Sequence, residues 1–210
     1  MHALIRGTAF GLVAGLLLAT ASLADDTVDV TELMTPSPLG DKALGDAAAP
    51  VTVIEYASLT CSHCGAFYRE TFDAFKTKYI DTGKVHFILR EYPLDQLALA
   101  AIMGAHCAPE TEFFAIVDTL FREQNDWAFV DNPGPALVER LKKHGLSEEA
   151  IMTCFGNQDL ADKIIAVEQR AGDKFGVEGT PTFFFNGRKQ VGEITIDQVD
   201  AVMAPLLAKP

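Results

Sequence analysis

The chain has 210 residues, of which 49% are hydrophobic and 22% are charged, enough for one domain, or one domain with an insertion, around a buried core. It carries 17 Lys and Arg against 29 Asp and Glu, which gives a formal net charge of −12. This acidic balance argues against nucleic acid and anionic membrane surfaces as partners.

The N-terminal segment differs in kind from the rest of the chain. Arg6 precedes an apolar run from Ala9 to Ala19, and Ser22-Leu23-Ala24 offers small residues at the two positions that a signal peptidase reads. The run is well short of the roughly 20 residues that a membrane-spanning helix needs. We therefore predict a secretory signal peptide over residues 1–24, cleaved before Asp25. Export implies a periplasmic, oxidising location in which disulfides persist.

The elements that follow begin with an arm and a strand. Residues 25–50 are rich in Pro, Gly, Ala and Asp and predict an extended N-terminal arm with a short edge strand near residues 41–44. Residues 51–56, Val-Thr-Val-Ile-Glu-Tyr, are typical of a β-strand, and a four-residue link then leads to Cys61. Behind Cys61, aromatic residues recur at helical spacing and predict an amphipathic helix: Tyr68, Phe72, Phe75 and Tyr79.

The Cys61-Ser62-His63-Cys64 motif lies where this strand gives way to the helix. Unpaired N–H groups and the helix dipole favour a thiolate on the first cysteine. We therefore expect Cys61 to be the exposed nucleophile and Cys64 the more buried resolving partner. A protonated His63 would stabilise the thiolate further. This setting is typical of a thioredoxin-like redox pair.

Two other interpretations of the motif are a structural disulfide and half of a zinc site. Zinc needs two more ligands, and Cys107 and Cys154 lie apart in the sequence, without a second C-x-x-C or an H-x-x-x-H pattern. We predict no metal site.

The remaining elements follow in chain order. A second core strand is predicted over residues 84–90, after a Thr82-Gly83 turn. Five helices are then predicted over residues 97–106, 112–124, 136–144, 147–155 and 160–175, with Gly145 ending the third and Ser147 capping the fourth. A strand at 182–185 is followed by Asn186-Gly187, a strong hairpin signal, and by a partner strand at 189–191. Residues 195–208 predict a closing helix.

The order of these elements, the Cys61-Ser62-His63-Cys64 motif, Glu55 and Gly179-Thr180-Pro181-Thr182 together resemble the DsbA family of exported thiol:disulfide oxidoreductases, from about Leu39 to the C-terminus. The resemblance implies an α/β, thioredoxin-like fold with an inserted helical domain. The thioredoxin-like part would comprise residues 51–93 and 176–210, and the helical insertion residues 94–175.

The resemblance also implies a substrate-binding loop. In thioredoxin-like folds a cis-proline loop faces the active-site cysteines, and Pro181 matches that position. From the residues alone the bond before Pro181 would be expected to be trans, and the proline could simply begin a strand. By likeness, Thr180 and Pro181 would bind an extended substrate segment beside Cys61. Ser62 belongs to the same surface. Many family members have proline at this place, and the dipeptide between the two cysteines tunes the redox potential, so Ser62 affects how strong an oxidant the pair is.

Glu55 lies six residues before Cys61 in an otherwise apolar strand. A carboxylate in a central strand is costly unless it is paired or protonated, so the position suggests a raised pKa and proton exchange with Cys64. The family carries an acidic residue at the matching place. The alternative is an edge-facing, solvated glutamate.

Cys107 and Cys154 lie within the predicted helical insertion. An exported protein seldom leaves two thiols free, and several DsbA-like proteins have a second pair, so we expect a structural disulfide between them. The alternative is two buried free cysteines. His86, His106 and His144 are expected to be ordinary core or surface residues.

The sequence therefore predicts an exported dithiol oxidase that introduces disulfides into newly exported, cysteine-containing proteins, without a cofactor. By family likeness a membrane-bound DsbB-like protein would reoxidise it. The first alternative is a reductase or isomerase of the same fold. The arm is too short for the dimerisation domain of such isomerases, so we expect a monomer. A second alternative is a peptide-binding chaperone or metal-handling protein.

Overall fold

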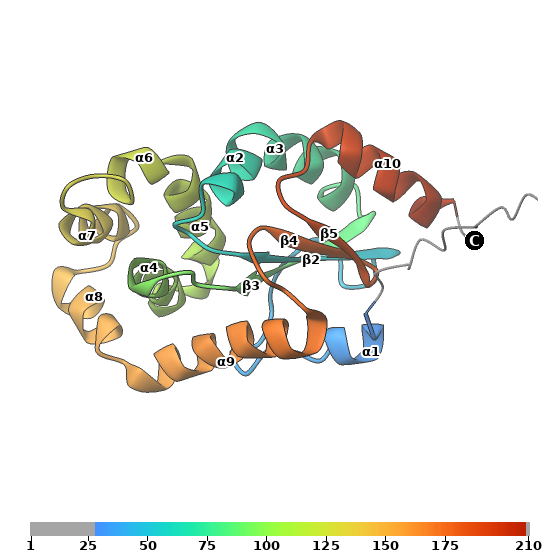
Figure 1. Ribbon diagram of the computed structural model, residues 1–210. Helices are drawn as coiled ribbons and strands as arrows, with labels where there is room; N and C mark the ends of the chain where they lie inside the picture. The colour runs from blue at the N-terminus through green and yellow to red at the C-terminus, as the bar shows by residue number, and fades with distance from the viewer. Residues whose placement is uncertain (1–27, 209–210) are drawn as a thin grey trace, which may run out of the picture.

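The computed structural model describes residues 28–208, so the predicted signal peptide lies outside the described residues. At its centre is a five-stranded sheet in the order β1-β3-β2-β4-β5, with helices on both faces (Figure 1). The strands are β1 (Lys42–Leu44), β2 (Val51–Ala57), β3 (Val85–Glu91), β4 (Thr182–Phe185) and β5 (Arg188–Val191). The α/β, thioredoxin-like fold expected from the sequence is confirmed.

The central strand β2 is the reference for the site. It runs parallel to β3 and antiparallel to β4, and this register places Glu55 opposite Leu89 on one side and Phe183 on the other. The outer strands β1 and β5 pair antiparallel with β3 and β4. The predicted hairpin after β4 is confirmed by the positive φ angles of Asn186 (47°) and Gly187 (88°), which a tight turn between these strands needs.

The first layer of helices, above the sheet in Figure 1, consists of α2 (Ser62–Glu70), α3 (Phe72–Phe75) and α10 (Ile196–Leu207). The expected single helix behind Cys61 is in fact divided. It breaks at Thr71 (φ −120°, ψ −38°), and a π-helix, η1 (Lys76–Ile80), follows α3. The rings of the aromatic series contact one another, and Phe72 also contacts Phe87 on β3. Phe67, in the same segment, contacts Phe183 on β4.

The second layer, below the sheet, consists of α1 (Val30–Leu33) and the C-terminal half of α9 (Gln158–Phe175) (Figure 1). Three apolar residues of α9 pack on the face of the sheet formed by Ile54, Ile88 and Phe184: Val167, Ala171 and Phe175. This packing places the end of α9 with the sheet, so it favours an insertion that ends earlier than residue 175.

The helical insertion lies between β3 and α9, at the left of Figure 1. Its helices are α4 (Gln96–Cys107), a 3₁₀ turn η2 (Glu110–Glu112), α5 (Phe113–Arg122), α6 (Gln124–Trp127), α7 (Pro133–Lys143) and α8 (Glu148–Phe155). The predicted helix ends at Gly145 (φ 86°) and Ser147 are confirmed, since Ser147 accepts a hydrogen bond from the N–H of Ala150. No helix among residues 28–208 combines the length and the apolar character that crossing a membrane would require.

The N-terminal arm is less extended than expected, because α1 forms within it. This four-residue helix is capped by Asp29, whose carboxylate accepts hydrogen bonds from the N–H groups of Thr31 and Glu32. Four residues cannot sustain a helix alone, so tertiary contacts must hold it. The buried guanidinium of Arg90 supplies one set, donating to the carbonyl oxygen of Leu33 (2.7 Å) and to both carboxylate oxygens of Asp41 (3.1 Å each). Arg170 of α9 supplies another, donating to the carbonyl oxygens of Glu32 and Thr35.

We expect Arg90→Met to lower the free energy of unfolding by about 3 kcal/mol, because it leaves Asp41 unpaired beside the sheet. Equilibrium urea unfolding measures this loss. Arg188→Met, at an exposed position on β5, is the matched control and should change stability by less than about 0.5 kcal/mol. Equal losses in the two variants would show that Arg90 does not anchor the arm.

Candidate active site

The two cysteines of the motif lie at the start of α2. Cys61 is the N-cap residue (φ −77°, ψ 118°), and no side chain caps the helix. Both thiols are free, and Cys61 is 8% exposed whereas Cys64 is fully buried. The expected order of burial is therefore confirmed, but the expectation of an openly exposed nucleophile is wrong. The loop before β4 contacts Cys61 through the carbonyl oxygen of Thr180.

That loop contains a cis peptide bond between Thr180 and Pro181. The Cys61 thiol donates a hydrogen bond to the carbonyl oxygen of Thr180 at 3.1 Å. Thr182 closes the loop, because its hydroxyl donates to the carbonyl oxygen of Gly179 at 2.7 Å. The cis isomer implied by family likeness is thus present, and the loop faces the cysteine pair.

The environment of Cys61 favours its thiolate. The Cys64 thiol beside it is the main reason why the pKa of Cys61 falls from its ordinary value to about 5. Burial opposes this change, and the Thr180 side chain and the backbone N–H groups of Cys64 and His63 support it. A thiol with this pKa is ionised at neutral pH and is therefore a nucleophile and a good leaving group.

Cys64 behaves in the opposite way. Burial raises its pKa well above the ordinary value, and the hydrogen bond that its thiol makes to the Cys61 thiolate, together with the charges of Glu55 and Cys61, adds to the rise. The pair therefore holds one proton on Cys64 while Cys61 is ionised. This asymmetry suits thiol–disulfide exchange, in which one sulfur attacks or leaves and the other resolves.

Glu55 is fully buried beneath α2. Its side chain shares the face of β2 with Val53 and Ala57, so the solvated, edge-facing alternative is wrong. Burial raises its pKa well above the ordinary value; the Tyr68 hydroxyl partly opposes the rise, and the Cys61 charge adds to it. Neither carboxyl oxygen has a well-formed hydrogen bond within the described residues. The carboxyl group is therefore set up to carry a proton rather than a charge.

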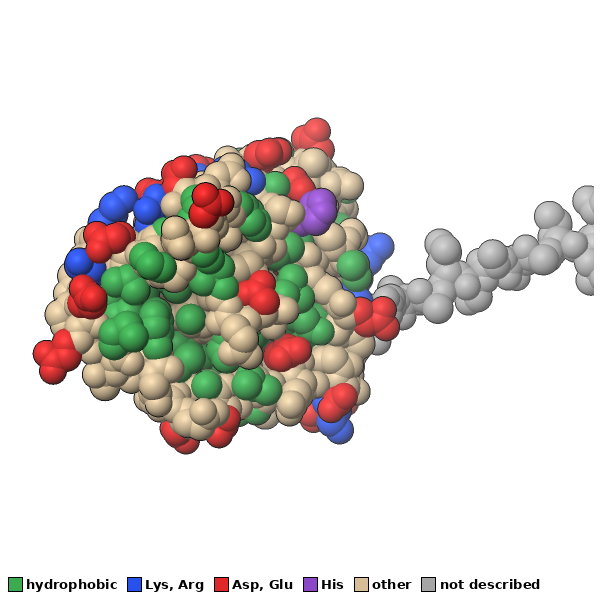
Figure 2. Space-filling model, turned by 60° about the vertical axis from the view of Figure 1, so that its left-hand side comes forward, with side chains coloured by type: hydrophobic (Ala, Val, Ile, Leu, Met, Phe, Trp, Pro, Cys, Tyr) green, Lys and Arg blue, Asp and Glu red, His purple; other side chains and the backbone are tan. Residues whose placement is uncertain are grey.

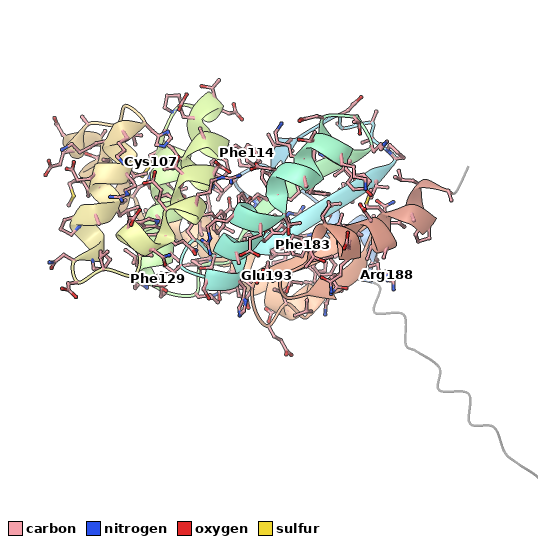
Figure 3. The ribbon with its side chains drawn as sticks, turned by 90° about the horizontal axis from the view of Figure 1, so that it is seen from above. Cys107, Phe114, Phe129, Phe183, Arg188 and Glu193 are labelled. Atoms are coloured by element: carbon pink, nitrogen blue, oxygen red, sulfur yellow. A yellow bond between two sulfur atoms is a disulfide. The ribbon has the colours of Figure 1, made fainter. Side chains whose placement is uncertain are left out.

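His63 and Ser62 are exposed on the first turn of α2. The His63 imidazole Nδ1 lies 3.3 Å from Oε2 of Glu193, and Figure 3 shows Glu193 at the same edge of the molecule as the exposed Phe129. It is the backbone N–H of His63 that lowers the pKa of Cys61 in this geometry. A further effect of the imidazole charge stays a prediction.

Comparison with known proteins agrees with this geometry. The family model described as Thioredoxin matches residues 38–204. The crystal structure of alpha-DsbA1 from Wolbachia pipientis is 34% identical, with a TM-score of 0.77, and the match covers 85% of this chain and 96% of that one. The chain belongs to the DsbA family. A DsbA from Chlamydia trachomatis, 18% identical with a TM-score of 0.68, covers 81% of this chain and 92% of the other and shares the fold.

The chain also matches part of a longer relative. A Rickettsia conorii protein, named by inference as a protein-disulfide oxidoreductase, is 31% identical to this chain over 164 residues, which are 78% of this chain. The aligned part spans only 59% of the length of that relative.

The second cysteine pair of this DsbA-family chain forms a disulfide between Cys107, at the end of α4, and Cys154 in α8. Figure 3 shows Cys107 among the insertion helices, away from Glu193 at the active-site edge. The expected structural disulfide is confirmed. Of the described histidines other than His63, which are His86, His106 and His144, His106 pairs with the buried Glu91 at 2.6 Å, and His144 contacts the Thr119 hydroxyl at 3.1 Å. Within residues 28–208 no group of three or more His, Cys, Asp or Glu side chains could hold a metal ion.

Two polar residues near the cysteines were missed in the sequence. Tyr68 looked like part of an apolar face, yet its buried hydroxyl is the polar neighbour of Glu55. Gln124 looked like the polar end of a helix, yet it is only 1% exposed. The sequence does contain a signal that Gln124 is buried. It lies three positions after Phe121 and four after Leu120, so it continues the buried face of α5 into the next turn.

Proposed function

We propose that the chain is a thiol:disulfide oxidoreductase that introduces disulfide bonds into exported proteins through Cys61 and Cys64. The observation that carries the proposal is the position of the Cys61 sulfur, at the N-terminus of α2 and 3.1 Å from the Thr180 carbonyl oxygen of the cis-proline loop. This arrangement presents one reactive sulfur beside a backbone that can pair with an extended peptide.

The reaction starts from the Cys61–Cys64 disulfide. A substrate thiolate attacks the Cys61 sulfur, and Cys64 leaves as a thiolate that takes up a proton. The substrate's second thiol loses its proton and attacks the first substrate sulfur, so that Cys61 leaves as a stabilised thiolate. The substrate is oxidised by two electrons, and the enzyme pair is reduced by the same two.

Glu55 would supply the proton to Cys64. Its buried carboxyl is held in the neutral form and is coupled electrostatically to that sulfur. When Cys64 is released as a thiolate in an apolar site, transfer of this proton removes an unfavourable buried charge. The reverse transfer would prepare Cys64 to close the disulfide again.

The substrate would lie along Ser62, Thr180 and Pro181. A cysteine-containing segment in extended conformation can pair with the backbone of Thr180 and place its sulfur on Cys61, as in strand addition to a sheet edge. The exposed Phe129 (53%) belongs to the insertion, whose face carries gathered hydrophobic side chains with acidic ones among them (Figure 2). Such a surface suits unfolded chains, which expose apolar residues.

The setting would be the periplasm, reached by means of the signal peptide at residues 1–24. The substrates would be newly exported proteins that contain cysteines, and a membrane-bound, DsbB-like protein would reoxidise the reduced pair. The predicted monomer and the absence of a cofactor complete this proposal.

The test is the equilibrium of the pair with glutathione. An oxidase should show a reduction potential less negative than about −200 mV, since a strongly oxidising DsbA lies near −120 mV and thioredoxin near −270 mV. The oxidised protein should also convert a reduced two-cysteine peptide to its disulfide, with one equivalent of protein consumed for each disulfide formed. A potential near that of thioredoxin, with reduction of disulfide substrates, would instead support the alternative of a reductase or isomerase.

A further inference from the structure

Gln124, the first residue of α6, reaches from the helical insertion into the loop that precedes the active-site helix. Its side-chain Nε2 donates hydrogen bonds to the carbonyl oxygens of Leu59 and Cys61, each at 2.9 Å. The side chain is 1% exposed, so both bonds form away from water. Buried donors and acceptors of this kind are costly to leave unpaired.

Gly65 makes room for this amide. A Cβ atom at Gly65 would lie 2.0 Å from Oε1 of Gln124, a distance that no side chain tolerates. Glycine inside a helix is less favourable than alanine, so its presence one residue after Cys64 needs a reason. The close approach of Gln124 supplies that reason.

A second contact fastens the same two segments in the reverse direction. Arg69 of α2 donates from Nη1 to the carbonyl oxygen of Phe121, near the end of α5, at 3.2 Å. The insertion thus donates to the active-site loop, and the active-site helix donates to the insertion. Hydrogen bonds donated from both sides therefore hold α2 and its preceding loop against the α5–α6 junction.

The position of these bonds bears on the chemistry of Cys61. The carbonyl oxygens of Leu59 and Cys61 lie on either side of the Thr60–Cys61 peptide, and the Cys61 oxygen also accepts the N–H of Gly65 at 3.1 Å. No side chain caps α2, which leaves the N–H groups of its first turn free, and Gln124 instead holds the carbonyl oxygen of the N-cap residue Cys61. That turn contains the N–H groups of His63 and Cys64, which stabilise the Cys61 thiolate.

We propose that Gln124 is a positioning residue, through which the helical insertion fixes the first turn of α2 and so directs its N–H groups at the Cys61 sulfur. The inference deepens the proposed function and rests on it for its relevance to turnover. Gln124 itself does not touch the reacting sulfur atoms.

The test compares Gln124→Leu, which removes both donated bonds, with the wild-type chain. Thiolate absorbance of the reduced protein against pH gives the pKa of Cys61, and glutathione equilibration gives the redox constant. We expect the pKa to rise by about one unit and the redox constant to shift about tenfold toward the disulfide, because one pKa unit is one factor of ten. Gly65→Ala should displace the Gln124 amide from its place, and so should shift the Cys61 pKa and the redox constant in the same direction. This second variant tests the proposal if Gln124→Leu does not fold.

Gly104→Ala is the matched control. Gly104 is also a buried helical glycine, and a Cβ there would lie 2.5 Å from a methyl carbon of Leu141, far from the active-site loop in sequence and within the insertion. It should lower thermal stability and leave the Cys61 pKa unchanged. A Cys61 pKa that stays at the wild-type value in both Gln124→Leu and Gly65→Ala would overturn the proposal. A reductase-like wild-type potential with shifted pKa values in the variants would refute the oxidase and leave the role of Gln124 standing.

Discussion

Replacing Cys64 with alanine is expected to raise the pKa of Cys61 from about 5 toward the ordinary value of a free thiol, about 8.5, because the Cys64 thiol is the main group that stabilises the thiolate. Catalytic oxidation of dithiols should stop, since no disulfide remains to be transferred. Thiolate absorbance followed against pH gives the shift, and oxidation of a two-cysteine peptide gives the loss of activity.

The pH dependence follows from the sign of this shift. Cys61 has a lowered pKa in the folded, reduced protein, so its thiolate stabilises that form fully above the pKa of a free thiol. The contribution falls with decreasing pH and is lost as the pH drops through about 5. The stability of reduced wild-type protein should therefore decline over this window relative to reduced Cys64→Ala. Parallel stability curves for the two proteins would contradict the assignment of Cys64 as the stabilising neighbour.

His63→Ala provides a graded comparison. The backbone N–H of His63 remains in the variant, so only the imidazole contribution is lost. The rise in the Cys61 pKa should be smaller than in Cys64→Ala. A rise as large as in Cys64→Ala would show that the imidazole charge, rather than the neighbouring thiol, dominates.

Glu55→Leu is expected to stabilise the protein by about 1–3 kcal/mol at neutral pH, because it removes a buried carboxyl group whose two oxygens lack hydrogen-bond partners in the described part of the chain. The same change should slow the exchange steps in which Cys64 gains or loses a proton. Stability and activity would therefore move in opposite directions. Urea unfolding and single-turnover exchange with a reduced peptide measure the two effects.

The stability gain should depend on pH in a defined sense. The unfolded chain releases the Glu55 proton near pH 4.3, whereas burial keeps it bound to higher pH in the folded protein. The wild type therefore loses stability as the pH rises above about 4.3, and the advantage of Glu55→Leu grows over the same range. Glu149→Leu, at an exposed site on α8, is the control and should show no such trend. A constant difference between Glu55→Leu and the wild type from pH 4 to 8 would mean that Glu55 ionises normally in the folded state.

Local patterns were sufficient to predict much of the fold. The strand before Cys61, the Asn186-Gly187 hairpin and the caps at Gly145 and Ser147 depend on residues close together in the chain, and the structure has all of them. The cis bond at Pro181 was expected only through family likeness, because sequence alone favours trans.

The features that were missed depend on distant contacts. Helix α1 is too short to form on its own and needs Arg90, which lies far along the chain. The break at Thr71 carries no proline or glycine signal, and the rings on either side of it, Phe67 and Phe72, contact each other. The buried Cys61 sulfur likewise contacts the carbonyl oxygen of Thr180, 119 positions away. Helical spacing and helix propensity depend on residues close together in the chain, so they cannot predict contacts between residues far apart in the sequence.

The placement of β4 has a consequence for the order in which the chain can assemble. The N–H of Thr52, on β2, bonds the side chain of Asn186, which follows β4, across 134 positions. The insertion closes much shorter loops, and its disulfide joins residues 47 positions apart. Closing a long loop costs more entropy than closing a short one, and chains emerge from the N-terminus first. The insertion can therefore fold while the central sheet still lacks β4, and the contact between the Cys61 sulfur and Thr180 forms only after the chain beyond the insertion has been made.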